Sequence, residues 1–347
     1  MAPPLSTVDL ELILANTRDF WPEMRGQSIF ITGGTGFFGC WLVESFAYVN
    51  RIAGLNAHAT ILTRDPAAFA RKCPHLASDQ AITLHSGDVR SFNYPDGEFK
   101  YVIHAATESG GRQPAEGPVE TLATILRGTE RVLEFAGSHG TRKLLLTSSG
   151  AVYGSQPPAI THLPEDYTGA PNPLISSSAY SEGKRAAELM CAVCGSAKGI
   201  ECKIARCFAF VGPHLPLDAH FAIGNFIRDA MRGDVIHVNG DGTPKRSYMY
   251  AADLAIWLWT ILFRAPAMEA YNVGSDQAIS ILELANTVAA TLCSPAKVLV
   301  AQEAVPGAPV MQYVPSTWNA EQQLDLKRNV SLEDAVRRTA AWHGYSC

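Results

Sequence analysis

Short apolar runs alternate with longer stretches of helical spacing along the first part of the chain. The runs are rich in Ile, Val and Leu, as in parallel strands that are covered on both faces. The clearest helical pattern between them covers about 119–138. This alternation predicts an α/β fold with a Rossmann-type doubly wound parallel sheet, whose ligands bind beyond the carboxyl ends of the strands. The predicted strands occupy residues 28–32, 59–63, 81–85, 101–105, 143–148 and 202–208.

The regular alternation ends near Phe208. Two segments that contain Gly and Pro, 210–217 and 240–244, interrupt it. We therefore expect a smaller lobe over the sheet, with a substrate cleft between the two parts. A helix cap near Ser6 or Thr7 predicts a further helix at the N-terminus. The predicted parts are an N-terminal helical extension at 1–25, a dinucleotide-binding domain at 26–212 and 247–275, and a smaller C-terminal substrate-binding lobe at 213–246 and 276–347.

Charge and hydropathy exclude two kinds of partner. The 347-residue chain has a net charge of -5 and no basic run that could follow a phosphate backbone, so we expect no nucleic acid partner. The most apolar stretch, 254–263, is too short to cross a bilayer and predicts a buried helix rather than a membrane anchor. The first 25 residues lack the basic and then apolar order of a secretory signal, so we expect a cytoplasmic protein.

Cysteines and histidines give no metal-binding pattern. The chain has eight cysteines and enough core-forming residues not to need disulfides. Cys191 and Cys194 form one Cys-x-x-Cys on a predicted helix, but no second pair lies at metal-ligand spacing. The ten histidines form no cluster in the sequence. We therefore predict that the protein has no metal site.

A glycine-rich turn follows the first predicted strand. Gly33, Gly36 and Gly39 lie between that strand and a predicted helix that covers 40–48. Because glycine has no Cβ, the backbone N–H groups of such a turn and the N-terminus of the next helix can approach a pyrophosphate. The turn therefore predicts a dinucleotide site at the end of the first strand.

A candidate base occurs later in the chain. Tyr180 and Lys184 are four residues apart on a predicted helix, so they lie on the same face. A tyrosine acts as a base near neutral pH only if its pKa falls by about three units, which requires roughly 4 kcal/mol. The Lys184 ammonium and a positive nicotinamide ring are expected to supply this energy. Ser149, at the end of a predicted strand, can hydrogen-bond an oxygen that becomes a carbonyl.

Four motifs occur in one order along the chain. They are the glycine turn, the strand end at 103–106, the serine-glycine string at 148–154, and the pair Tyr180 and Lys184. Over about 26–290 they resemble the extended short-chain dehydrogenase/reductases of the NAD(P)-dependent nucleotide-sugar epimerase/dehydratase family. The resemblance implies a nucleotide-diphosphosugar substrate and a homodimer.

The resemblance also implies a role for individual residues. The expected catalytic residues are the base Tyr180, its partner Lys184 and the hydroxyl of Ser149. The residues expected to contact the dinucleotide are Gly33, Thr35, Gly36, Phe37, Phe38, Gly39, Thr63, Arg64, Asp88, Val89, Ala105, Ala106, Thr107, Tyr180 and Lys184. Those expected to contact the substrate are Ser148, Ser149, Gly150, Asn225 and Arg246.

The string at 148–154 departs from part of the family. Sugar dehydratases and decarboxylases carry carboxylates where this chain has Gly150 and Ala151, and neither residue can transfer a proton. We therefore expect a 4-epimerase rather than a 4,6-dehydratase or a decarboxylase, and we expect the small residues to leave room for a sugar ring to rotate. One alternative is an NADPH-dependent keto-sugar reductase. Another, from a different class, is a redox sensor that binds the dinucleotide without catalysis.

The end of the second predicted strand bears on the choice of cofactor. NAD-specific relatives carry an acidic residue there that binds the ribose hydroxyls, whereas this chain has Thr63 followed by Arg64. A guanidinium can bind a 2′-phosphate through two hydrogen bonds. Asp65, the next residue, is an alternative partner for the ribose. The sequence therefore favours NADP slightly over NAD.

Overall fold

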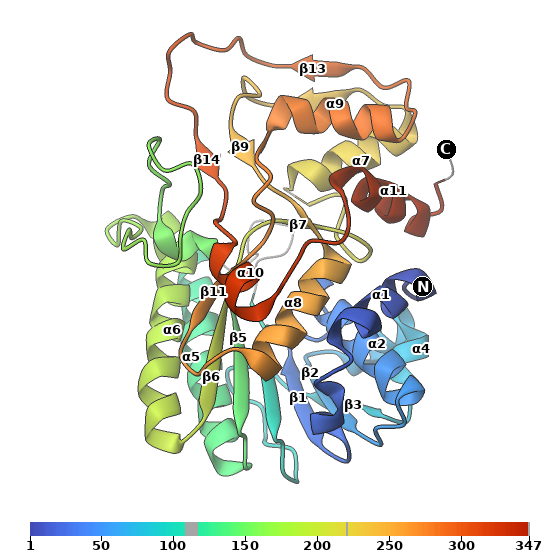
Figure 1. Ribbon diagram of the computed structural model, residues 1–347, viewed down its shortest axis with the longest axis vertical. Helices are drawn as coiled ribbons and strands as arrows, with labels where there is room; N and C mark the ends of the chain where they lie inside the picture. The colour runs from blue at the N-terminus through green and yellow to red at the C-terminus, as the bar shows by residue number, and fades with distance from the viewer. Residues whose placement is uncertain (108–116, 220, 346–347) are drawn as a thin grey trace.

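The main sheet runs through the lower part of the molecule (Figure 1). The computed structural model describes residues 1–107, 117–219 and 221–345. Within these ranges the sheet has seven strands, all parallel, in the order β11-β6-β5-β4-β1-β2-β3. The predicted fold class is thereby confirmed. The strands are β1 (Ser28–Thr32), β2 (His58–Thr63), β3 (Ile82–Ser86), β4 (Tyr101–His104), β5 (Lys143–Ser149), β6 (Glu201–Cys207) and β11 (Ala270–Val273).

The six strands predicted from the apolar runs are all present, with ends shifted by at most one residue. The sequence did not predict β11, which pairs with β6 at one edge of the sheet. Strand β1 lies between β2 and β4, so the order of connection reverses on its two sides. In such sheets ligands bind at this reversal, outside the carboxyl ends of the strands.

The alternation of side chains on β1 explains why helices cover both faces of the sheet. Ile29 and Ile31 belong to a large buried cluster with residues of α1, α2 and α8, whereas Phe30 belongs to a second cluster with residues of α5 and α6. Figure 1 shows these two groups of helices on opposite sides of the sheet. The helices are α1 (Thr7–Thr17), α2 (Phe37–Ile52), α5 (Gly117–Ser138), α6 (Ala179–Lys198) and α8 (Ala251–Arg264).

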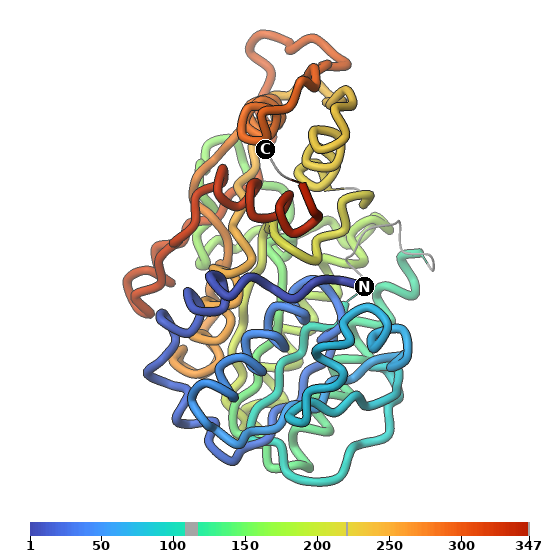
Figure 2. The backbone as a smooth tube through the Cα atoms, turned by 90° about the vertical axis from the view of Figure 1, so that its right-hand side faces the viewer, coloured from blue at the N-terminus to red at the C-terminus, as the bar shows by residue number. Residues whose placement is uncertain are grey.

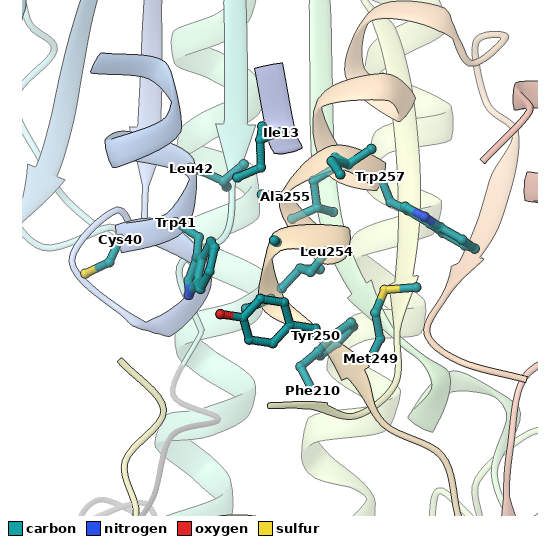
Figure 3. Packing of buried hydrophobic residues seen from close by; sticks show 14 of the residues in the cluster. Ile13, Cys40, Trp41, Leu42, Phe210, Met249, Tyr250, Leu254, Ala255 and Trp257 are labelled. Atoms are coloured by element: carbon teal, nitrogen blue, oxygen red, sulfur yellow. The ribbon is translucent and has the colours of Figure 1, made fainter. Parts of the chain in front are cut away.

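Helix α8 forms the centre of the larger cluster, and Figure 3 shows part of its packing against α2. All its residues from Ala251 to Phe263 are buried. The apolar stretch at 254–263 is therefore a buried helix, as expected. In the described part of the chain, no helix combines the length and the apolar character needed to cross a membrane.

Polar contacts join helix α1 to the start of α8 and to the C-terminal helix. Ser6 caps it by accepting a hydrogen bond from the backbone N–H of Val8. Asp9 is 1% exposed and accepts hydrogen bonds from the hydroxyl of Tyr250 at 2.8 Å and the guanidinium of Arg338 at 2.5 Å. The N-terminal segment is thus held against α8 and the C-terminal helix.

Smaller elements lie over one end of the main sheet (Figures 1 and 2). Among them, β12, β9 and β14 form a small sheet, and β13 pairs with β8. The division of the chain into two domains stays a prediction. The remaining elements are α3 (Pro66–Lys72), α4 (Pro74–Ala77), α7 (Ala222–Arg232), α9 (Ile281–Thr291), α10 (Trp318–Leu324), α11 (Leu332–Trp342), β7 (Phe210–Val211), β8 (Ile236–Val238), β9 (Lys245–Arg246), β10 (Met249–Tyr250), β12 (Ile279–Ser280), β13 (Val298–Val300), β14 (Gln312–Tyr313) and the 3₁₀ turns Trp21–Met24, Gly150–Tyr153 and Ser176–Ser178.

Candidate active site

The glycine turn packs so tightly that side chains are excluded from two of its positions. Gly33 has φ +72°, and a Cβ there would lie 2.4 Å from the carbonyl oxygen of Ala105. A Cβ on Gly39 would lie 2.2 Å from the carbonyl oxygen of Gly33. Gly36 caps α2, which begins at Phe37. The turn therefore presents bare backbone at a helix N-terminus, which fits the pyrophosphate of a dinucleotide.

The other residues predicted around the turn lie close to it. The rings of Phe37 and Phe38 lie 5.6 Å apart in the first turn of α2, and the Phe38 ring contacts Phe210 edge-on. The carbonyl of Thr35 accepts a hydrogen bond from Lys72 at 3.0 Å. These contacts hold the first turn of α2 in place.

A buried histidine joins the ends of β1 and β4 to α5. The Thr32 hydroxyl lies 2.8 Å from Nδ1 of His104, and Nε2 of the same ring lies 3.2 Å from the Thr129 hydroxyl. Thr129 donates its own proton to the Ile125 carbonyl, so Nε2–H must be the donor to Thr129 and Nδ1 the acceptor. Burial lowers the pKa of His104 to about 3, which keeps the ring neutral. The backbone N–H of Ala106 also donates to Thr32, which fixes the strand end beside the glycine turn.

Lys184 reaches from α6 to the ends of β4 and β5. Its ammonium donates hydrogen bonds of 2.7 Å to the Thr107 hydroxyl and to the Thr147 carbonyl. The side chain is buried, and desolvation lowers its pKa to about 8. The structure thus brings Lys184 next to Ala106 and Thr107, the predicted strand-end contacts of the dinucleotide.

Ser149 connects the predicted base to a tyrosine that the sequence analysis missed. The Ser149 hydroxyl accepts the backbone N–H of Ala151 at 3.2 Å, and it lies close enough to the hydroxyls of Tyr180 and Tyr313 to lower the pKa of each. Desolvation raises the pKa of Tyr180, and the nearby Ser149 hydroxyl offsets this in part. The Lys184 ammonium lies 6.0 Å from the centre of the Tyr180 ring. The lowering of the Tyr180 pKa that we expected from Lys184 is not found in the protein alone.

Tyr313 lies in β14, far along the chain from every motif in the sequence. Its ring lies 4.6 Å from the Phe208 ring, and the Arg246 guanidinium lies 5.9 Å from its centre. A Cβ on Gly150 would lie 2.6 Å from the Phe208 ring and 2.7 Å from the Tyr313 hydroxyl. The expected room for sugar rotation beside Gly150 is therefore filled by two aromatic rings.

Arg246 and Asn225 come from the elements above the sheet. The guanidinium of Arg246 donates to the carbonyl of its neighbour Lys245 and lies near Tyr313, which places it beside the Ser149 cluster. The side-chain oxygen of Asn225, on α7, accepts a hydrogen bond from Arg228 at 3.2 Å. The structure does not bring Asn225 into contact with the catalytic candidates through any of its described hydrogen bonds.

Ser148 points to the opposite side of β5 from Ser149. Its hydroxyl donates a 2.5 Å hydrogen bond to Glu188, and Glu188 pairs with Arg206 at 2.8 Å. Ser148 is therefore part of an internal ion-pair network that includes the hydroxyl of Tyr153, an acceptor of Arg206. The Ser148 hydroxyl, which we expected to contact substrate, is therefore already hydrogen-bonded to Glu188.

Polar residues at the end of β2 lie where an adenosine ribose binds in this kind of sheet. Thr63 is buried at the strand end, and Arg64 lies close enough to lower the pKa of Asp88. The larger cause of that lowered pKa is the hydrogen bonds that Arg90 donates to Asp88. The Asp65 carboxylate caps α3 by accepting the N–H of Ala68 at 2.8 Å. Asp65 is thus already engaged by the backbone.

Val89, the residue after Asp88, has a packing role. It packs against the cluster beneath α5 and α6, and a Cβ on Gly128 would come within 3.1 Å of it. The absence of a side chain at Gly128 therefore lets α5 approach the strand ends.

The fold and the site define a class: a doubly wound dinucleotide fold with a Ser-Tyr-Lys cluster at the carboxyl ends of its strands. The chain belongs to the NAD dependent epimerase/dehydratase family, whose model matches residues 29–274. The predicted family and the need for a nicotinamide dinucleotide are thereby confirmed.

Curated relatives cover nearly the whole chain. The chain is 34% identical to UDP-glucuronic acid decarboxylase 3 of Arabidopsis thaliana over 325 residues, which cover 93% of this chain and 90% of the relative. It is 28% identical to UDP-glucuronic acid decarboxylase 1 of Danio rerio over 342 residues, 97% of this chain and 78% of the relative.

Solved structures with the same fold include two epimerases. UDP-N-acetylglucosamine 4-epimerase from Methanobrevibacter ruminantium M1 has a TM-score of 0.76 at 19% identity, covering 92% of this chain and 99% of its own. UDP-glucuronic acid 4-epimerase from Bacillus cereus has a TM-score of 0.75 at 21% identity, covering 91% and 98%. At these identities the likeness concerns the fold.

One expectation is wrong. Gly150 and Ala151 led us to disfavour decarboxylases and to choose between an epimerase and a reductase, yet the curated relatives are consistently named UDP-glucuronic acid decarboxylases. The physical reason lies in the chemistry. A uronate oxidised at C4 is a β-keto acid, and it loses carbon dioxide when electrons from the C5–C6 bond move to the C4 oxygen. This step needs a hydrogen-bonded ketone rather than a carboxylate base, so small residues at 150 and 151 do not exclude it.

Proposed function

We propose that this protein oxidises C4 of a UDP-linked uronic acid and decarboxylates the resulting keto acid to a UDP-pentose. The observation that carries the proposal is the cluster in which the Ser149 hydroxyl lies beside Tyr180 while Lys184 binds the ends of β4 and β5. The names of the curated relatives support the uronate and the uridine nucleotide. A nicotinamide dinucleotide held by the Gly33–Gly39 turn would accept a hydride from C4 and return it.

Tyr180 takes and returns the proton in this proposal. The phenol oxygen removes the proton of the C4 hydroxyl as the carbonyl forms. Because desolvation raises the pKa of Tyr180, a nearby positive charge must offset that effect. Lys184, whose ammonium lies 6.0 Å from the centre of the Tyr180 ring, does not lower that pKa in the protein alone, so a positive nicotinamide bound beside Tyr180 would have to supply the charge.

Ser149 stabilises the charge that develops on the C4 oxygen. When the C5–C6 bond breaks, carbon dioxide leaves and its bonding electrons move to that oxygen as an enolate. The Ser149 hydroxyl and the protonated Tyr180 are the donors available to it. A proton from solvent water then adds to C5 and restores the ketone. The ketone would take the hydride back from the reduced dinucleotide and a proton from Tyr180, which gives the alcohol.

The aromatic pair Phe208 and Tyr313 favours decarboxylation over epimerisation. An epimerase must turn the 4-keto sugar so that hydride returns to its opposite face, and this movement needs open space. The two rings fill the space beside Gly150. Decarboxylation with hydride return to the same face needs no such turn.

A 4-epimerase is the second candidate. The serine-glycine string from Ser148 to Gly154 resembles that of epimerases, and epimerases are among the proteins with the same fold. Both reactions share the 4-keto intermediate. They differ in whether carbon is lost.

The preference for NADP stays a prediction. Asp65 caps α3, and Thr63 and Arg64 are the two polar residues that precede it at the end of β2. We expect Arg64→Asp to weaken NADP binding more than NAD binding, because a carboxylate repels the 2′-phosphate. Equal loss for the two cofactors would remove Arg64 from the ribose site.

We also propose that the protein forms a homodimer through α5 and α6. We further propose that it is located in the cytoplasm. Val119 on α5 and Leu189 and Val193 on α6 are between 62% and 76% exposed. Large apolar side chains on adjacent helices form a face that a second copy can cover. Light scattering of the wild type and of Leu189→Lys tests this pairing.

The function is tested by incubating the purified protein with UDP-glucuronate, UDP-glucose and UDP-N-acetylglucosamine. Release of carbon dioxide and appearance of a UDP-pentose, followed by NMR, are expected from the uronate. A UDP-galacturonate product without loss of carbon would support the second candidate. Net consumption of NADPH would instead indicate a reductase.

A folded, dinucleotide-loaded sample that converts none of these sugars would overturn the proposal and favour a sensor. Glu188→Gln serves as a control for general damage, because Glu188 belongs to the neighbouring ion-pair network and not to the Ser149 cluster.

A further inference from the structure

Three side chains of the types that bind metals meet at the start of α2, away from the Ser149 cluster. Cys40 lies in α2, Cys73 lies between α3 and α4, and His214 follows β7. Their ligand atoms all lie within 4.8 Å of one another, and all three residues are buried. Among the described residues, this is the one group of three or more His, Cys, Asp or Glu side chains that meets this distance.

The backbone around His214 is held in a fixed position. The indole N–H of Trp41 donates a 2.9 Å hydrogen bond to the carbonyl of Pro213, and the imidazole lies 4.7 Å from the Trp342 ring. Figure 3 shows Cys40 and Trp41 at consecutive positions of α2, with their side chains pointing to different sides. Trp41 thus holds the His214 segment close to the thiol of Cys40.

His214 lacks the hydrogen bonds that a buried imidazole normally has. The residue is 7% exposed, and neither Nδ1 nor Nε2 has a hydrogen-bond partner among the residues that the structure describes. Leaving a buried polar atom unpaired costs roughly 1–3 kcal/mol. A ring nitrogen with a free lone pair, facing two sulfur atoms, is the arrangement that a metal ion satisfies.

The two thiols already interact with each other and with a positive charge. The sulfur atoms of Cys40 and Cys73 lie within 4.8 Å of each other, close enough to shift each other's pKa. The Lys72 ammonium lies 3.7 Å from Sγ of Cys40 and also donates to the carbonyl of Thr35. This ammonium favours thiolate, the form of cysteine that binds metals, and so opposes the rise in the Cys40 pKa that Cys73 and burial cause.

We propose that Cys40, Cys73 and His214 bind one thiophilic metal ion, Zn²⁺ in particular. Two thiolates balance the charge of a divalent ion, and sulfur with imidazole nitrogen is a ligand set that zinc prefers. In a tetrahedral zinc site the ligand atoms lie roughly 3.5–3.8 Å apart, from Zn–S and Zn–N bonds of about 2.3 and 2.0 Å. The side chains therefore need to move inward by at most about 1 Å.

Binding would release the two thiol protons and leave the fourth position to water. Because Cys40 donates its backbone N–H to Gly36, the ion would fix the first turn of α2 to the α3–α4 junction and to the segment after β7. The site would thus stabilise the dinucleotide turn without taking part in the chemistry at Tyr180. It does not depend on which sugar is the substrate.

The chain offers a matched control for these cysteines. Cys191 on α6 and Cys202 on β6 are also buried and close enough to shift each other's pKa, but no histidine joins them in a ligand group within the described ranges. Cys293 is exposed and is the obvious place for adventitious binding. The variants Cys191→Ala and Cys293→Ser therefore test whether any metal goes elsewhere.

The experiment uses the full chain, treated with chelator and reductant and then titrated with Zn²⁺ or with Co²⁺ as a coloured substitute. We expect one Zn²⁺ per chain by elemental analysis, a thiolate-to-cobalt absorption band, and a higher melting temperature with zinc. His214→Asn and Cys73→Ala should each weaken zinc binding at least 10-fold, whereas Cys191→Ala and Cys293→Ser should bind as the wild type does. Asparagine suits position 214 because the backbone there has φ +69°.

Three results would overturn the proposal. They are a wild type that takes up no zinc, a cobalt spectrum without the sulfur band, and a His214→Asn variant with wild-type affinity. A Cys40–Cys73 disulfide that forms equally fast with and without zinc would also contradict it, because bound thiolates are protected. Circular dichroism of each variant shows that loss of binding does not come from loss of the fold.

Discussion

His104 and His214 are both buried, and in both burial lowers the pKa to about 3, but their hydrogen bonding differs completely. Both ring nitrogens of His104 contact threonine hydroxyls, at 2.8 and 3.2 Å. Neither nitrogen of His214 has a hydrogen-bond partner in the described part of the chain. His104 therefore stabilises the strand ends beside the catalytic cluster. The ring nitrogens of His214, in contrast, form no hydrogen bond within the described residues.

The difference teaches that a shifted pKa alone does not identify a functional histidine. The same desolvation acts on both rings, and only the geometry around the nitrogens separates a structural residue from a candidate ligand. Variants of the catalytic cluster and of the Cys40–Cys73–His214 cluster should therefore differ in whether they lose turnover, stability or metal binding.

The largest effect is expected at the base. Tyr180→Phe should lower turnover by about 100-fold or more, because general acid/base assistance is lost, and leave dinucleotide binding nearly intact. Zinc binding at Cys40 and Cys73 should not change. Steady-state rates, dinucleotide titration and zinc titration of the same preparation check this. Turnover near that of the wild type would remove Tyr180 from the mechanism.

Substituting each histidine by asparagine compares the two regions directly. His104→Asn should lower the free energy of unfolding by about 2 kcal/mol, because the buried hydroxyls of Thr32 and Thr129 lose their partner. His214→Asn, measured without metal, should cost less than His104→Asn, because it removes the ring contact with Trp342 but no hydrogen bond within the described residues. Urea unfolding measures both. Equal losses would mean that His214 has partners of its own.

Stability should also depend on pH through both rings. An unfolded histidine binds its proton near pH 6.5, but these rings do so only near pH 3 when folded. Between these values the unfolded state binds more protons, so the free energy of unfolding falls as the pH drops from 6.5 towards 3 and is fully retained above 6.5. Each ring contributes at most about 1.4 kcal/mol per pH unit.

Metal-free His214→Asn should therefore lose stability more slowly on acidification than the wild type does. The difference in slope should approach about 1.4 kcal/mol per pH unit, measured by urea unfolding between about pH 6 and pH 5. Parallel curves for the variant and the wild type would show that His214 is protonated as easily in the folded chain as in the unfolded one.

The catalytic cluster could be predicted because its parts are encoded locally. Tyr180 and Lys184 share a helix face by their spacing, and Gly33 and Ser149 lie at the ends of apolar strands, which parallel pairing brings to one edge of the sheet. Strand β11 was not predicted because Asn272 interrupts its apolar pattern. That side chain is buried, and it is satisfied by the carbonyls of 163 and 316 and the hydroxyl of Tyr153.

The metal cluster could not be predicted because helix α2 and two separate connecting segments assemble it. Cys40, Cys73 and His214 are far apart in the sequence, and no spacing relates them. Tyr313 was missed for the same reason, since a short strand in an irregular segment places it beside Ser149. The decarboxylase was wrongly disfavoured for another reason. We assumed that the reaction needs a carboxylate at position 150 or 151, whereas decarboxylation needs only a stabilised ketone.

The smallest effect is expected from Tyr313→Phe, which removes one hydroxyl from the Ser149 cluster and keeps the ring that packs on Phe208. A neutral hydrogen bond contributes about 0.5–1.5 kcal/mol, so turnover should fall by about 3- to 10-fold. Tyr271→Phe is the matched control, because its hydroxyl bonds to Gln323 outside the cluster. If Tyr313 positions Ser149, its variant should lower kcat more than it raises KM and should shift the pH profile of turnover, whereas the control should do neither. A change confined to KM would place Tyr313 at the substrate instead, with no influence on the hydroxyl that Ser149 offers to the reacting oxygen.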